Sequence, residues 1–175
     1  MQMILHLANT TELLGRARRV REQVFTIEKQ IPKSIEVDQL DCLNDSCDHF
    51  VIEVLAQDEC SAKYRNTDGK EICSLGGDLT RSTDVCALRC KKLDDKRIQL
   101  QRFCVLKDYR ETGVGRWALE QVEKYYWKQG VEEITLDAKF HVSGFYEKCG
   151  YVVASELFME AGVEHVAMEK RRKWG

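Results

Sequence analysis

Proline is nearly absent from this chain, and so is any long hydrophobic run. Pro32 is the single proline among 175 residues, which excludes collagen-like repeats and proline-rich linkers. No segment approaches the roughly 20 apolar residues of a membrane-spanning helix, and residues 1–7 lack the basic and long apolar parts of a secretory leader. We therefore expect a protein without a membrane partner, located in the cytoplasm with access to the nucleus.

An excess of one charge is also missing. Lys and Arg total 27 against 29 for Asp and Glu, a net charge of -2, so the chain has no general attraction to polyanions and we expect no nucleic-acid partner. Its length and its 43% of hydrophobic residues fit one globular domain over residues 1–175. We expect a polar insertion around residues 58–71, where Asp68-Gly69 signals a turn in a hairpin or mobile excursion.

Cysteine is plentiful, with eight residues, but its spacing does not indicate a metal site. Four residues lie between Cys42 and Cys47, three lie between Cys86 and Cys90, and no CxxC pair occurs. A disulfide framework needs a short chain in a secretory context. We expect reduced thiols and no bound metal.

Hydrophobic periodicity predicts an alternation of strands and helices. Thr10 and Thr11 are good helix N-cap residues, and apolar side chains recur at three- or four-residue spacing from Leu13 to Ile27. The arginines of this helix are expected on a solvated surface. The acidic segment 36–41 lies in a long irregular stretch and is expected to be either a solvated loop or an attractor of a cationic amine.

The rest of the chain predicts further strands and two more helices. Two strands that flank a charged turn are expected to pair as a hairpin, and the last two strands are expected to pair with each other. Gly113 is expected to open a helix that Gly130 stops. The expected strands cover residues 3–7, 49–56, 85–90, 98–105, 133–138, 151–153 and 163–168, and a short helix covers residues 142–148.

The segment around Gly113 and Gly115 is the most informative part of the sequence. A strand precedes it and a helix follows, and glycines let the backbone turn tightly beside the free N–H groups of a helix start. Such a place favours a diphosphate.

Two other nucleotide-binding patterns compete with this one. Gly113-Val-Gly115-Arg-Trp-Ala118 fits GxGxx(G/A), with Asp137 about 20 residues further on, as in a dinucleotide fold. Seven residues separate the strand from Gly113, however, and only 60 residues follow Gly115, too few for a doubly wound sheet. A P-loop is excluded because no glycine precedes Lys-Ser or Lys-Thr in the required pattern.

The motif Arg110-x-x-Gly113-x-Gly115 resembles the acetyl-CoA diphosphate motif of the GNAT N-acetyltransferases. Phe145-Tyr146-Glu-Lys-Cys-Gly150-Tyr151 resembles the second GNAT signature, with one helix and one strand between the two motifs. This resemblance implies a single-domain α/β fold with a mixed, mostly antiparallel sheet flanked by helices. It also implies an acetyl-CoA-dependent N-acetyltransferase.

Two branches of that family share further features with the chain. The pattern from Arg21 to His49, with Glu36-Val-Asp38-x-x-Asp41 inside it, and the ending 155–168 are similar to ElaA-like proteins. Thr135-Leu-Asp137 with the Phe-Tyr-Glu-Lys-Cys-Gly run resembles glucosamine-6-phosphate N-acetyltransferases. That branch ranks second because Gln101-Arg-Phe103 replaces the acidic motif expected before the glycine loop.

The resemblance implies which residues hold acetyl-CoA. Backbone N–H groups from Glu111 to Arg116 would hold the diphosphate, and the backbone around Cys104 would pair with the pantetheine arm. Lys139 stands where GNAT sequences often carry Asn or Gln near the cofactor. The full cofactor set is Phe103, Cys104, Val105, Arg110, Glu111, Thr112, Gly113, Val114, Gly115, Arg116 and Lys139.

The catalytic residues follow from the same resemblance and from general acid–base chemistry. Tyr146 is the expected general acid for the leaving thiolate. Glu28 is the preferred base among the carboxylates and imidazoles near the motifs, which also include Glu36, Asp38, His49 and His165. Glu36, Asp38 and His49 are the expected substrate-binding residues.

The resulting hypothesis is transfer of an acetyl group from acetyl-CoA to a small-molecule primary amine by direct attack in a ternary complex. The alternatives are the glucosamine-6-phosphate type of acetyltransferase and a non-catalytic acyl-CoA-binding sensor module. A homodimer is compatible with the sequence.

Overall fold

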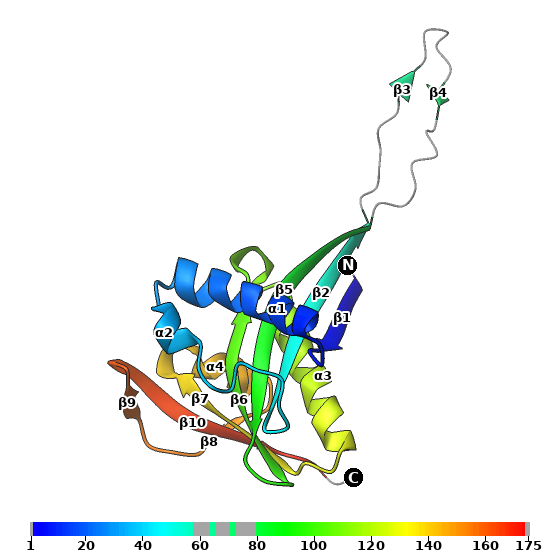
Figure 1. Ribbon diagram of the computed structural model, residues 1–175. Helices are drawn as coiled ribbons and strands as arrows, with labels where there is room; N and C mark the ends of the chain where they lie inside the picture. The colour runs from blue at the N-terminus through cyan, green and yellow to red at the C-terminus, as the bar shows by residue number, and fades with distance from the viewer. Residues whose placement is uncertain (1, 58–63, 66–70, 73–79, 174–175) are drawn as a thin grey trace.

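The computed structural model describes residues 2–57, 64–65, 71–72 and 80–173 (Figure 1). Eight strands form one open sheet in the order β1-β2-β5-β6-β7-β10-β8, and β9 pairs with β10. Every neighbouring pair is antiparallel except β6 and β7, which confirms the mixed, mostly antiparallel α/β fold. The strands are β1 (Gln2–Leu7), β2 (Cys47–Gln57), β5 (Thr80–Lys92), β6 (Arg97–Val105), β7 (Glu133–Lys139), β8 (Val152–Val153), β9 (Phe158–Glu160) and β10 (Val163–Arg171).

The predicted pairings are confirmed. The strands β5 and β6 form the expected hairpin, and β8 pairs with β10 through Val153 and Met168. Most of the polar segment 58–71 lies outside the described residues. Its described part, β3 (Tyr64–Arg65), pairs antiparallel with β4 (Glu71–Ile72).

Helices cover both faces of the sheet (Figure 1). Along β2, the side chains of Phe50 and Ile52 join the core under α3, whereas Val51 between them joins the core under α1. This period-two alternation places the two helices on opposite faces. The helices are α1 (Thr11–Arg21), α2 (Lys33–Glu36), α3 (Val114–Lys128) and α4 (Ser143–Lys148), with 3-10 turns at η2 (Lys107–Tyr109) and η3 (Phe140–Val142).

The first predicted helix forms, but it changes type along its length. The side chain of Thr10 accepts a hydrogen bond from the Leu13 N–H and caps α1. From Glu22 to Glu28 the chain continues as a π-helix, η1, which ends where the Lys29 N–H donates to the Val24 carbonyl.

The arginines of α1 are not all on a solvated surface, so that expectation is wrong for two of them. Arg21 is fully buried, and its guanidinium pairs with Glu36 and Asp41 from the acidic segment. Arg16 binds the Asp84 carboxylate of β5 through Nε and Nη2. The arginines turn inward because acidic groups from other elements pack against the helix.

The described cysteines are all free thiols, namely Cys42, Cys47, Cys86, Cys90, Cys104 and Cys149. Within the described ranges, no group of three or more His, Cys, Asp and Glu side chains is placed to hold a metal ion. None of the described helices has both the length and the apolar character needed to cross a bilayer.

Candidate active site

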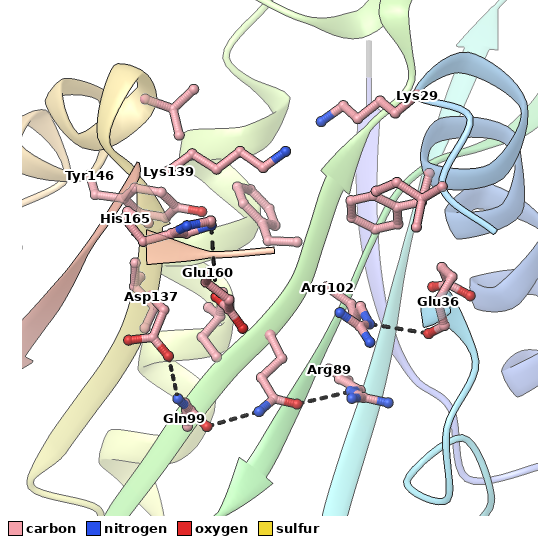
Figure 2. A pocket seen from close by; sticks show the side chains of 18 of the residues that line it. Lys29, Glu36, Arg89, Gln99, Arg102, Asp137, Lys139, Tyr146, Glu160 and His165 are labelled. Carbon is pink, nitrogen blue, oxygen red and sulfur yellow. Dashed lines mark hydrogen bonds and ion pairs between the residues drawn. The ribbon is translucent and has the colours of Figure 1, made fainter. Parts of the chain in front are cut away.

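The central feature of the site is a divergence of β6 from β7. Their parallel pairing covers only Arg97–Gln99 of β6 against Glu133–Thr135 of β7. Beyond these residues each strand keeps its outer partner, β5 or β10, but loses the inner one. A cavity of about 520 Å³ lies at the divergence and is lined from β6, β7, α4, β10 and the segment after η1 (Figure 2).

A local irregularity of β6 accompanies this divergence. Arg102 has a positive φ of 52°, and the register between β5 and β6 shifts between Ala87 and Arg89. Such bulges bend a strand and redirect its side chains. The Arg102 guanidinium donates to the backbone carbonyls of Ile35 and Glu36, which ties the bulge to α2.

The start of α3 has the features of an anion site. Gly113 precedes the helix with a φ of 91°, a conformation that favours glycine, and it makes no side-chain cap. The first helix turn carries no acidic residue, and the Thr112 hydroxyl donates to the Tyr109 carbonyl instead of capping the helix. The first backbone N–H groups of α3 therefore have no partner within the helix and are available to a diphosphate.

Glycine is favoured at position 115 for a different structural reason than at position 113. A Cβ atom built on Gly115 would lie 3.5 Å from each of the side chains of Phe103, Val105 and Phe145. This is ordinary contact distance, so a small side chain fits and a branched one would press into the rings that border the cleft. The Phe103 and Phe145 rings stack with centroids 6.1 Å apart.

Arg110 organises the loop before α3 through its side chain. Its Nε donates to the Val105 carbonyl at 3.0 Å, and its two terminal nitrogens bind both carboxylate oxygens of Glu28. The hydrogen bond from Arg110 lowers the pKa of Glu28. Glu28 does not line the cavity, so its geometry does not support a role as base.

The remaining expected cofactor residues lie around this loop. Val114 is fully buried, whereas Arg116 is exposed and pairs with Glu120 on the helix surface. Glu111 has a positive φ of 63°. Phe103 lines the cavity, while the Cys104 thiol is buried in the core under α1, which raises its pKa to about 12.

Tyr146 reaches the cavity from α4 (Figure 2). Its ring packs edge-on against Phe145 and Tyr151, with centroids 5.1 Å and 5.9 Å away, and it lies beside Phe103. Burial, with smaller effects of Cys149, raises the pKa of Tyr146, so the hydroxyl keeps its proton at neutral pH. These aromatic contacts hold the ring in place.

The acidic segment is neither a solvated loop nor a set of free charges. Glu36 and Asp41 are buried against Arg21, and Asp38 binds Arg89 of β5 through both carboxylate oxygens, at 2.7 Å and 2.6 Å. Glu36 and Asp38 line the cavity as expected for substrate-binding residues, but arginines already compensate their charge.

His49 does not line the cavity. It is buried, and its Nε2 lies 2.8 Å from the Leu40 carbonyl, which can only accept, so Nε2 carries the proton. Burial lowers the pKa of His49. This side chain anchors the end of the acidic segment, and the expectation that it contacts substrate is not supported.

Two pairs of like charges face the cavity. Lys29 follows η1 and Lys139 ends β7; burial, and secondly repulsion by Lys139, lowers the pKa of Lys29. Asp137 of β7 and Glu160 of β9 form the acidic pair, with His165 of β10 at 3.8 Å from Glu160 (Figure 2). The cofactor expectation for Lys139 is compatible with its position on the cleft wall.

In the sequence, Asp137 stands out only in the dinucleotide pattern and in the glucosamine-6-phosphate resemblance, and no site role is predicted for Gln99 or Gln101. All three line the cavity, and a hydrogen bond of 2.9 Å joins Gln99 to Asp137. The alternation of β7, in which Ile134, Leu136 and Ala138 are buried, could have indicated that Asp137 points away from the core. The linear sequence does not reveal that β6, with Gln99, is the strand beside Asp137.

Comparisons with known proteins give a consistent result. Two family models, each described as an acetyltransferase (GNAT) domain, match residues 85–172 and 20–119. The uncharacterized N-acetyltransferase YjcF of Bacillus subtilis is 30% identical over 165 residues, which cover 94% of this chain and 96% of that protein.

Solved structures share the fold over nearly the whole chain. Escherichia coli ElaA matches with a TM-score of 0.69 at 18% identity, covering 97% of this chain and 99% of that one. An aminoglycoside 6'-N-acetyltransferase in complex with coenzyme A matches with a TM-score of 0.63 at 14% identity, covering 98% and 97%.

Proposed function

The chain belongs to the GNAT acetyltransferase family, as its two sequence motifs indicated, and we propose that it transfers the acetyl group of acetyl-CoA to a small-molecule primary amine. The transfer is direct, within a ternary complex. The whole chain, 1–175, is the catalytic domain in this proposal, and it acts in the cytoplasm.

The divergence of β6 and β7 is the observation that carries this proposal. It leaves backbone groups of both strands without a strand partner beside a cavity that contains Phe103 and Tyr146. A pantetheine arm offers amide groups that can pair with such a strand edge. The diphosphate would be held by the N–H groups at the start of α3, and Arg110 would keep that loop in place.

The chemistry requires two proton transfers and one acyl transfer. The amine nitrogen attacks the thioester carbonyl carbon, a C–N bond forms, and the C–S bond breaks. A backbone N–H of β6 near Phe103 would polarise the carbonyl, an effect worth about 3 kcal/mol in other enzymes. Tyr146 donates its proton to the leaving thiolate and regains one from solvent.

The test is to mix the protein with acetyl-CoA and a panel of primary amines and to measure CoA release. The panel contains alkylamines, diamines, amino acids, glucosamine 6-phosphate and a peptide with a free amino terminus. Mass spectrometry of the products then identifies the acetylated amine. Turnover of at least one amine supports the proposal, and preference for glucosamine 6-phosphate would favour the second branch of the family.

A sensor module would give a different result in the same experiment. Calorimetry would show acetyl-CoA binding, but no amine of the panel would release CoA faster than acetyl-CoA alone. That combination would contradict the enzymatic proposal.

A further inference from the structure

We propose that Asp137 is the catalytic residue that binds the acceptor amine and takes its proton, and that Gln99, Gln101 and Arg89 position it through a chain of hydrogen bonds. This inference rests on the proposed acetyltransfer and assigns the base that the reaction needs. Asp137 lies on β7 with its side chain exposed to the cavity that Tyr146 also lines (Figure 2).

The hydrogen-bond chain crosses three neighbouring strands. Arg89 of β5 donates from Nε to Gln101 Oε1 at 3.1 Å, and Gln101 of β6 donates from Nε2 to Gln99 Oε1 at 2.8 Å. Gln99 then donates from Nε2 to Asp137 Oδ2 at 2.9 Å. The chain runs across the point where β6 and β7 begin to diverge.

The direction of every hydrogen bond in this chain is determined by its two ends. An arginine can only donate and an ionised carboxylate can only accept, so each glutamine must present its oxygen toward Arg89 and its nitrogen toward Asp137. Arg89 is itself held by two hydrogen bonds to Asp38. The chain therefore fixes Oδ2 of Asp137 and leaves Oδ1 without a hydrogen-bond partner among the described residues.

The charges around Asp137 favour a cationic ligand. Glu160 faces it from β9, His165 from β10 and the neutral Gln99 from β6, while Lys139 follows it on its own strand. Partial burial, and secondly repulsion by Glu160, raises the pKa of Asp137, although His165 and Gln99 oppose this. An ammonium group between Asp137 and Glu160 would relieve their repulsion.

The proton balance of the reaction gives Asp137 its role. A protonated amine has no lone pair for attack, so one proton must leave the nitrogen before or during C–N bond formation. Oδ1 of Asp137 accepts that proton and later releases it to solvent, while Tyr146 supplies the proton that the leaving thiolate takes. Among the other carboxylates of the cavity wall, Glu36 and Asp38 are engaged by arginines, whereas Glu160 lies 3.8 Å from His165 and its side chain is 61% exposed to solvent.

The decisive variant is Asp137→Asn, assayed with the amine of the panel that the wild type acetylates with the highest kcat/KM. This substitution keeps the size of the side chain and an oxygen for Gln99, but it removes the proton acceptor. We expect kcat/KM for the amine to fall by about 10²–10⁴-fold, the usual contribution of general acid–base catalysis. Affinity for acetyl-CoA and the thermal midpoint are expected to stay unchanged. Glu133→Gln, on the same strand but outside the cavity, is the matched control and is expected to keep the wild-type kcat/KM.

The pH profile separates a base from a merely structural carboxylate. The wild-type kcat/KM is expected to rise with pH as Asp137 ionises, and Asp137→Asn is expected to lose that rise. Glu160→Gln removes the charge that opposes ionisation of Asp137, so the rise should move to lower pH. Gln101→Leu breaks the hydrogen-bond chain without removing a charged side chain, and a loss of roughly tenfold is expected from a missing hydrogen bond.

The outcomes distinguish this inference from the proposed function. If Asp137→Asn retains the wild-type kcat/KM and pH profile, the assignment of Asp137 is overturned while acetyltransfer stands. If the wild type binds acetyl-CoA but acetylates no amine of the panel, the proposed function fails, and the role of Asp137 fails with it.

Discussion

Arg110 and Glu28 are joined by two hydrogen bonds, 2.7 Å from Nη1 to Oε1 and 2.5 Å from Nη2 to Oε2, although 82 positions separate them in the chain. The pair connects the end of η1 to the loop that precedes α3. Both carboxylate oxygens of Glu28 accept a hydrogen bond from Arg110, and Glu28 lies outside the cavity, so this geometry favours a role in the shape of the loop over one in proton transfer.

Glu28→Gln is therefore expected to retain most of the activity. The pair is partly exposed, and such ion pairs contribute up to about 1 kcal/mol, which corresponds to a loss of acetyl-CoA affinity of no more than about fivefold. The pH profile of kcat/KM should stay that of the wild type. A large fall in kcat with loss of the acidic limb would instead identify Glu28 as the base.

Substitutions at Gly115 test the diphosphate site. Gly115→Val places two methyl groups beyond a Cβ that already lies 3.5 Å from Phe103, Phe145 and Val105, so the rings or the helix start must move and acetyl-CoA binding should be lost. Gly115→Ala needs only the Cβ and is the matched control, with measurable binding expected. Calorimetry on folded variants decides, and unchanged affinity of Gly115→Val would refute the assignment.

Tyr146→Phe removes the proposed general acid and leaves the packing of the ring intact. The expected fall in kcat is about 10²–10⁴-fold, with acetyl-CoA affinity and thermal midpoint preserved. Single-turnover acetyl transfer under rapid mixing is the measurement, because it is insensitive to slow product release. A wild-type rate constant in the variant would leave Tyr146 as a packing residue only.

The buried ion pairs of Arg21 make stability depend on pH. Burial alone would raise the pKa of Asp41, but hydrogen bonds from Arg21 and from the Asp38 N–H outweigh it and lower the pKa from 3.8 to about 2. A carboxyl whose pKa is lower in the folded state stabilises the protein above its unfolded pKa. This contribution should be lost as the pH falls from about 4 to about 2.

Asp41→Asn tests the same cluster at neutral pH. Breaking a buried pair from one side costs about 3–5 kcal/mol of the free energy of unfolding, and urea denaturation should show a decrease of this order. The control is Glu22→Gln, whose pair with Lys33 is exposed, so urea denaturation of this variant is expected to stay close to that of the wild type. Equal effects of the two substitutions would contradict the buried role of Asp41.

Much of the fold follows from local patterns in the sequence. The glycines at 113 and 130 marked both ends of α3, since each adopts a positive φ that other residues avoid. The β5–β6 hairpin was predictable because a short charged turn joins two apolar runs. The GNAT motifs around Gly113 and Tyr146 indicated the family, which the family models confirm.

Contacts between segments that are distant along the chain were not predictable in this way. Arg21 is a polar residue on a helix, and helical periodicity assigns such residues to solvent unless a partner from elsewhere is known. The hydrogen bonds that link Arg89 to Asp137 form only because β5, β6 and β7 are neighbours in the sheet. The sequence alone does not predict this strand order. Glu28 lies near family-like motifs in the sequence, but it pairs with Arg110, whose position depends on the fold of the loop before α3.

The short pairing of β6 with β7 leaves a seam, the stretch beyond Gln99 and Thr135 where the two strands are not paired with each other. Only three residue pairs join the half of the sheet that contains β5 and β6 to the half that contains β7 and β10. A ligand that fills the seam contacts both β6 and β7 where these strands do not pair with each other. Its binding energy therefore also stabilises the association of the two halves of the sheet. Ligand at 100 times its Kd would add about 2.7 kcal/mol to the free energy of unfolding, and the melting temperature then becomes a direct readout of occupancy for any acyl-CoA.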